Sequence, residues 1–160
     1  MKPKRGSTLF LRVAIVLIGV AALAALIRFP LTEGRAAHPD LVSIYADPFI
    51  IYGYVAAIPF FVALYQALKL LGYVDSNQVF SQAAVRAVRN IKYCAIATGG
   101  FIVVGIIAIR FLANGDDPAG PTGLGVVLTF GAIVAATGAA VFERLLQNGA
   151  AMKSENDLTV

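Results

Sequence analysis

The densest group of side chains that could do chemistry is a run of basic residues between two apolar stretches. Arg86, Arg89 and Lys92 follow one another at three-residue spacing, and Asp75 is the single acidic residue of segment 69–92. Guanidinium and ammonium groups can bind lipid phosphates, and each contributes on the order of 1 kcal/mol beside an anionic leaflet. They can equally bind an acidic protein surface. The sequence therefore predicts a charged binding face in this segment.

The segment that must position these cations, 76–92, has the pattern of an amphipathic helix. Turn-forming residues open it, and Ser76 or Ser81 is suited to cap a helix. From there on two faces separate at helical spacing, with Phe80, Ala84, Ala87, Val88 and Ile91 on the apolar one and Gln82, Arg86, Arg89 and Asn90 on the polar one. Three interpretations stay open: a connector that follows the positive-inside rule, a docking face for a soluble partner, and a lipid-sensing helix on the membrane surface.

The composition is that of a membrane protein. Of the 160 residues 59% are hydrophobic and 14% are charged, and the mean hydropathy is +0.79, whereas soluble domains are about 25% charged. The net charge of +4 does not indicate nucleic acid, because the basic residues lie at the ends of apolar runs. Cys94 is the single cysteine, so no disulfide within the chain can form.

Four apolar runs are long enough to cross a bilayer. We expect spans at about 9–31, 48–71, 91–112 and 123–145, with a cytoplasmic amphipathic segment at 76–92 and a cytoplasmic tail at 146–160. The fourth run carries two rows of small residues at four-residue spacing, Gly131, Ala135 and Ala139, and Ala132, Ala136 and Ala140. Such rows allow close helix packing, within the chain or in a homo-oligomer. The predicted fold class is all-α, an integral membrane four-helix bundle forming one domain, 1–160.

The distribution of basic residues predicts the orientation. With both termini on one side, that side holds ten of the lysines and arginines and the other holds three, Arg28, Arg35 and Arg110. Because loops rich in lysine and arginine stay inside, we expect both termini in the cytoplasm.

Catalytic, metal-binding and cofactor-binding patterns are missing from the sequence. The spans carry no ionisable residue at their centres, which proton-coupled carriers usually need. His38 is the single histidine, and the neighbouring Asp116 and Asp117 are too few for a calcium site. We therefore expect no cofactor, no metal and no enzymatic activity.

Several stretches resemble a family of small bacterial four-span membrane proteins, domain of unknown function 2975. The resemblance covers about 9–160, and its most specific part is the closing signature Lys153-Ser154-Glu155-Asn156-Asp157-Leu158-Thr159-Val160. It implies an inner-membrane protein without an established activity. Because members of this family are often encoded beside a small helix-turn-helix regulator of the Cro/C1 type, it also suggests a partner.

We therefore predict a non-enzymatic membrane protein of the bacterial inner membrane, with a regulatory role through such a DNA-binding regulator and no direct contact to nucleic acid. The predicted partner-binding residues are Phe80, Arg86, Arg89, Lys153, Glu155, Asn156 and Asp157. The alternative is a small transporter or a pore formed by an oligomer. Binding of a soluble protein favours the first hypothesis, and flux across liposomes the second.

Overall fold

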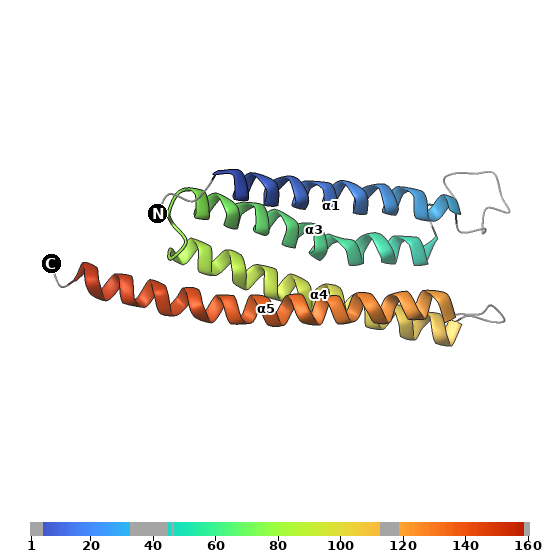
Figure 1. The fold of residues 1–160 in the computed structure, drawn as a ribbon. Coiled ribbons are helices and arrows are strands. Elements are labelled where there is room, and N and C mark those ends of the chain that lie inside the picture. The colour runs from blue at the N-terminus through green and yellow to red at the C-terminus, as the bar shows by residue number, and fades with distance from the viewer. Residues whose placement is uncertain (1–4, 33–44, 46, 113–118, 159–160) are drawn as a thin grey trace.

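The computed structural model describes residues 5–32, 45, 47–112 and 119–158. Its four helices are α1 (Arg5–Thr32), α3 (Pro48–Asp75), α4 (Gln82–Leu112) and α5 (Ala119–Asp157). All four are long and apolar enough to cross a membrane, which confirms the expected number of spans. They run antiparallel in succession, so that α1 and α4 begin, and α3 and α5 end, at one end of the molecule (Figure 1).

The helices form an open arrangement in which each backbone contacts only its neighbours in the chain. In the described residues α1 packs on α3, α3 on α4, and α4 most extensively on α5, while α1 touches neither α4 nor α5. Figure 1 shows the two halves diverging as layers, with α1 and α5 at the outer edges. The four expected helices are present, but they do not enclose a common core. The two helices at the edges, α1 and α5, leave most of their surface uncovered.

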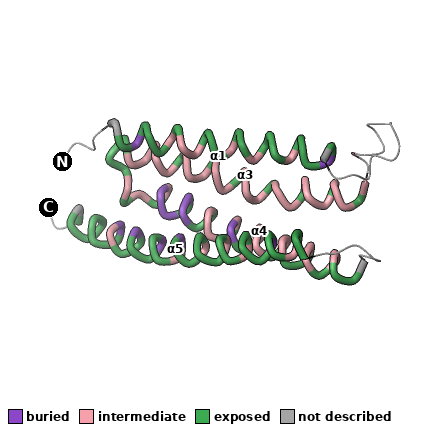
Figure 2. Tube along the Cα trace, turned by 45° about the vertical axis from the view of Figure 1, so that its right-hand side comes forward, coloured by how far each residue is buried: buried purple, intermediate pink, exposed green. Residues whose placement is uncertain are grey.

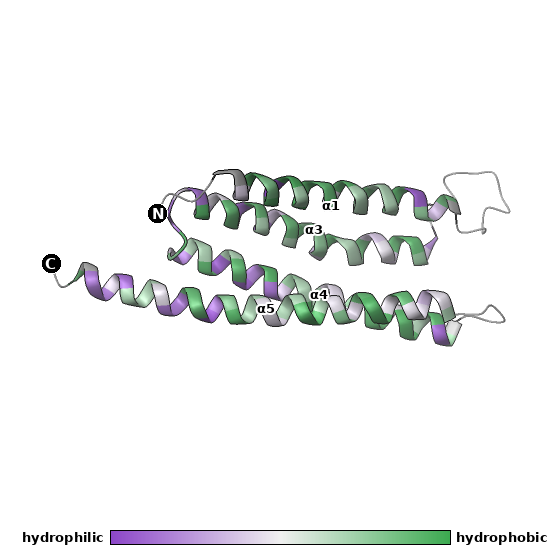
Figure 3. Cartoon of the chain, viewed as in Figure 1, coloured by the Kyte–Doolittle hydropathy of each residue, from purple (hydrophilic) through white to green (hydrophobic). Residues whose placement is uncertain are grey.

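The uncovered surface is apolar, as a bilayer requires. Large side chains along α1 and α5 are exposed, such as Phe10, Leu17 and Phe130 at 73%, 62% and 68%. Figure 3 shows hydrophobic residues along the middle of all four helices and more hydrophilic ones toward the end where α5 finishes. A lipid environment satisfies such a surface, since helices bond all their backbone groups internally.

Two of the expected boundaries differ from the structure. The segment 76–92 is not a separate surface helix, because α4 begins at Gln82 and runs without a break to Leu112. The tail 146–160 is helical as far as Asp157, as a direct continuation of the fourth span. At 1.5 Å per residue α5 is about 58 Å long, whereas the hydrocarbon core of a bilayer is about 30 Å thick. With 31 and 39 residues, α4 and α5 are therefore both longer than the hydrocarbon core of a bilayer is thick.

Local chemistry explains where the helices begin. The carboxylate of Asp47 accepts a hydrogen bond from the Phe49 amide at 2.7 Å, and Pro48 occupies the first turn of α3. Ser81 caps α4, with its hydroxyl accepting from the Ala84 amide at 3.2 Å. Between them Asn77 has a positive φ of 55°, which ends the turn after α3. Of the two expected capping serines, Ser81 takes the role at α4 and Ser76 closes the end of α3.

The contact between α4 and α5 follows a coiled-coil repeat. The side of α5 that faces α4 alternates spacings of three and four residues: Thr122, Gly125, Thr129, Ala132, Ala136, Ala139, Glu143, Leu146 and Ala150. A matching series runs along α4: Val85, Val88, Lys92, Ala95, Gly99, Ile102, Ile106 and Ile109. Such a repeat keeps one seam facing the partner over the whole length.

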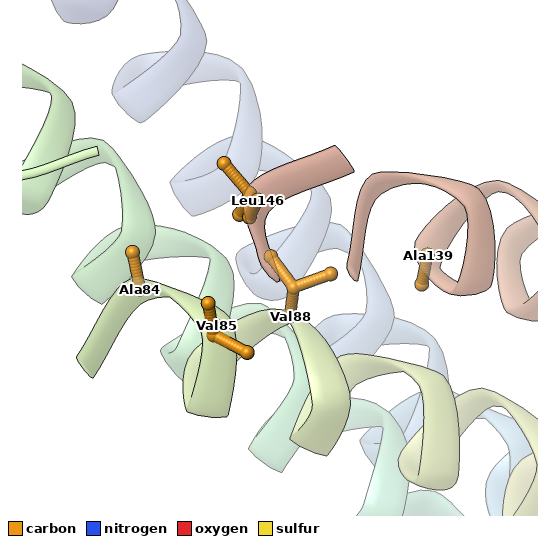
Figure 4. Close-up of a cluster of buried hydrophobic side chains, with 5 residues drawn as sticks. All are labelled: Ala84, Val85, Val88, Ala139 and Leu146. Atoms are coloured by element: carbon orange, nitrogen blue, oxygen red, sulfur yellow. The ribbon is translucent and has the colours of Figure 1, made fainter. Parts of the chain in front are cut away.

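Most of the buried residues lie along this seam, at the end where α4 begins. Figure 2 shows the purple buried segments concentrated at the start of α4 and along the facing part of α5. The core cluster there is Ala84, Val85, Val88, Ala139 and Leu146, drawn together in Figure 4. Leu70 and Tyr73 from α3 pack against it, so the cluster joins three helices. The helical part of the apolar face of segment 76–92, at Ala84, Ala87 and Val88, is therefore covered by protein and not by lipid, whereas Phe80 stays half exposed.

Candidate functional site

We call the end of the molecule where α4 begins and α5 finishes the basic end. Arg12, Lys69, Arg86, Arg89, Lys92, Arg144 and Lys153 lie on the parts of the four helices nearest to it. At the opposite end the described residues carry Arg28 and Arg110. The candidate site is built on the two helices that extend furthest past the span, α4 and α5.

A buried carboxylate organises the charges at this end. Glu143 of α5 is 6% exposed. Its Oε1 accepts a hydrogen bond from Arg89 Nε at 2.6 Å, and its Oε2 accepts one from Lys92 Nζ at 2.6 Å. Gln147, one turn further along α5, donates to Oε1 at 3.2 Å. The carboxylate thus has three donors, two of them cationic, which is what a buried charge needs.

This cluster occupies the seam and not its edge. Glu143 and Lys92 take positions that are otherwise filled by small or apolar residues on their helices. A polar pair at a seam position fixes the register of two helices, because any slip would leave a buried charge without its partner. The cluster therefore holds α4 and α5 in one register, between their apolar spans and the ends that form the surface of the basic end.

Beyond the cluster, the two helices enclose a shallow groove. It has a volume of about 340 Å³ and is lined by Phe80, Gln82, Ala150, Lys153, Ser154 and Leu158. Phe80 lies against Gly149, so closely that a Cβ on Gly149 would overlap the ring. Half of Phe80 remains exposed, and Leu158 is 85% exposed. Half of the lining is apolar, with one aromatic ring, and the other half is polar, with Lys153 as its one charged side chain.

The predicted binding residues whose side chains the structure describes fall into three groups. Phe80 and Lys153 come together in the groove, although they are far apart in the sequence. Arg89 is bound to Glu143 and helps to hold the helices, although 45% of its side chain stays exposed. Arg86 is exposed on α4, and Glu155 and Asn156 are exposed on α5. The side chain of Asp157 lies outside the described residues, as do His38, Asp116 and Asp117.

Glu143 is not singled out among the residues predicted from the sequence, and it lies inside the expected span 123–145. The signal was present in the seven-residue spacing of Ala136, Glu143 and Ala150, which places the glutamate in line with small seam residues. The four-residue rows of small residues do not include it. In the structure the residues of those rows point in different directions. Ala132 faces Gly99 of α4, whereas Gly131 has open space beside it.

A second ion pair ties the other two helices at the same end. Arg12 of α1 donates to Asp75 of α3 at 2.8 Å, and the two side chains are 43% and 33% exposed. Across the described residues no group of three histidine, cysteine, aspartate or glutamate side chains is placed to hold a metal ion. The chemistry that this end offers is charge and apolar contact.

Comparison with known proteins decides the family. Residues 7–160 match the family model described as protein of unknown function (DUF2975). The chain belongs to this family. It is also 45% identical over 159 residues to the uncharacterized membrane protein YoaS of Bacillus subtilis (strain 168), covering 98% of this chain and 99% of that protein. No solved structure matches the chain. This chain is thus a membrane protein with four candidate spans, and it has a relative in a bacterium.

Proposed function

We propose that this protein is a non-enzymatic regulatory membrane protein that binds a soluble protein in the groove at its basic end. The observation that carries the proposal is the joint extension of α4 and α5 past their apolar spans. From Glu143 to Asp157 α5 adds about 22 Å of helix beyond its uncharged part. A span has no need of such an extension, and its groove leaves Phe80 half exposed.

The proposed partner is a small DNA-binding regulator of the Cro/C1 helix-turn-helix type, and the basic end faces the cytoplasm. The resemblance suggests the partner class, because members of the family are often encoded beside such a regulator. The orientation rests on the ten lysines and arginines expected on the side of the termini, against three on the other side. Helix in groove is a common mode of recognition, in which apolar anchors at helical spacing enter an apolar groove. Lys153 adds an attraction for acidic residues beside those anchors.

A cavity between the spans gives the pore alternative no comparable support. The cavity between the spans is lined by apolar side chains such as Leu26, Phe101 and Ile106. An aqueous pathway needs polar groups along its wall.

The test is affinity purification in mild detergent, followed by binding of the purified regulator. The intact chain is compared with a chain truncated after Met152 and with Lys153→Glu. Lys69→Glu is the matched control, because it reverses a charge at the same end on α3, where Lys69 lies over the Tyr65 ring. We expect truncation to abolish binding, Lys153→Glu to weaken it at least fivefold, and Lys69→Glu to leave it unchanged. Equal loss in both lysine variants, or no regulator with the intact chain, would contradict the proposal.

A further inference from the structure

A second cavity lies at the opposite end, between the two halves of the molecule. It measures about 260 Å³ and is lined by all four helices. Residues 26–30 of α1 and 49–56 of α3 form one side, and residues 101–109 of α4 with Pro121 and Gly125 of α5 form the other. It exists because α1 and α5 diverge without touching, so that side chains border a space that no helix fills.

The two tyrosines in the wall of this cavity offer an occupant no free hydrogen-bond donor, because each hydroxyl already donates its proton to a backbone carbonyl. Tyr52 Oη donates to the carbonyl of Phe101 at 2.6 Å, and Tyr54 Oη donates to the carbonyl of Leu26 at 3.2 Å. The rest of the lining is aliphatic, aromatic, glycine and proline. An apolar cavity of about 150 Å³ already takes up benzene and stays dry. This larger one therefore suits hydrocarbon and repels water.

The position of the cavity indicates which hydrocarbon is available. Its lining residues belong to the candidate spans, so the medium around it consists of lipid chains. Arg110, which is exposed, follows the lining residue Ile109 directly. A long basic side chain at the end of a span reaches the level of the lipid phosphates. One ligand fits both features, with a hydrocarbon chain for the cavity and a phosphate for the arginine.

We infer that this cavity binds one acyl chain of a membrane glycerophospholipid, whose headgroup phosphate is held by Arg110. The bound chain fills the space between the α1–α3 pair and the α4–α5 pair. There it packs against helices of both pairs, including α1 and α5, which do not contact each other directly. This inference does not depend on the partner proposed for the basic end.

The test uses the intact protein in nanodiscs that contain phosphatidylglycerol with a diazirine near the end of one acyl chain. After irradiation, mass spectrometry of peptides locates the crosslinked residues. We expect adducts to concentrate in 49–56 and 101–109. Adducts spread evenly over the exposed faces of α1 and α5 would overturn the inference, because they would indicate ordinary bulk lipid.

Two glycines provide a matched pair of variants. A Cβ on Gly53, which lines the cavity, meets nothing within 4 Å, and the same is true of Gly100, which does not line it. Gly53→Leu should therefore fill the cavity and lower crosslinking in 101–109 at least fivefold, whereas Gly100→Leu should leave it unchanged. Equal crosslinking in both variants would contradict the proposed site. If Gly53→Leu does not fold, Ala56→Leu serves the same purpose at another lining residue.

Competition in the unmodified protein identifies the ligand. Excess unlabelled phosphatidylglycerol should lower the cavity adducts at least fivefold, and palmitate at equal concentration should not. Palmitate competing equally well would assign the cavity to a free fatty acid and overturn the role of the phosphate. Arg110→Gln should weaken the competition by phosphatidylglycerol about threefold, and an unchanged competition would likewise exclude the arginine.

Discussion

Lys92 of α4 and Glu143 of α5 meet at 2.6 Å between Nζ and Oε2, and both occupy the seam between their helices. Toward the membrane the seam consists largely of small and aliphatic residues, and away from it the two helices form the groove. The pair thus stands at the boundary between a region that lipid surrounds and a region that a soluble protein could reach. Removing either charge should affect the outer region first.

Replacing Glu143 with alanine should destabilise the contact between α4 and α5. The change leaves Arg89 and Lys92 without their shared acceptor, although both cations keep some access to water. Loss of a charged hydrogen-bond partner at a largely buried site costs on the order of 2 kcal/mol. Thermal unfolding in detergent should show a lower Tm, and Arg144→Ala, at the exposed neighbouring position, should change it little. Equal melting of the two variants would show that the cluster does not hold the helices.

Adding a methyl group at Gly149 should displace Phe80 and alter the groove. The Cβ of Gly149→Ala would overlap the Phe80 ring, whereas that of Gly138→Ala on the same helix meets nothing within 4 Å. Overpacking costs about 1–3 kcal/mol, and glycine to alanine in an unobstructed helix stabilises by about 0.4–1 kcal/mol. We therefore expect opposite shifts in Tm for the two variants. A stabilised Gly149→Ala would mean that the ring moves away without cost.

Removing the Tyr52 hydroxyl should weaken the packing of α3 on α4. Tyr52→Phe keeps the edge-to-face contact with the Phe101 ring, whose centroid is 5.9 Å away, and loses only the bond to the Phe101 carbonyl. Hydrogen bonds between membrane helices contribute about 0.6 kcal/mol on average and about 1.7 at most. The 2.6 Å bond of Tyr52 should lie near the upper value, and Tyr54→Phe, with a 3.2 Å bond to Leu26, near the average. Unfolding titrations in mixed micelles measure both, and a larger effect at Tyr54 would reverse this order.

The orientation can be tested with single cysteines in a Cys94→Ala background. Lys153→Cys lies at the basic end, and Gly120→Cys lies at the start of α5, at the opposite end. Because the basic end should stay inside, a membrane-impermeant maleimide should label Gly120→Cys in intact cells and Lys153→Cys only after lysis. Labelling of Lys153→Cys in intact cells would invert the topology and remove the cytoplasmic partner from consideration.

Composition and periodicity alone predicted the membrane class and the four spans, and the resemblance of the sequence motifs predicted the family. These features need no tertiary information, because a run of about 20 apolar residues has few other stable environments than a bilayer. The sequence also offered Ser76 or Ser81 as a cap, since a hydroxyl before a helix can satisfy a free amide of the first turn, and the structure selects Ser81 for α4. The faces of segment 76–92 were predicted correctly for Ala84, Ala87 and Val88, which are buried, whereas Phe80 of the same predicted face is half exposed.

What covers those faces was decided by the tertiary structure. An apolar helix face is equally suited to lipid and to another helix, and only the extension of α5 places Leu146 against Val88. The acceptor of Arg89 and Lys92 lies more than fifty residues away along the chain, so no local pattern could pair them. The same reason applies to the cavity at the opposite end, which arises where α1 and α5 diverge. The sequence therefore determined which segments enter the membrane, and long-range packing determined which charges and surfaces remain available for binding.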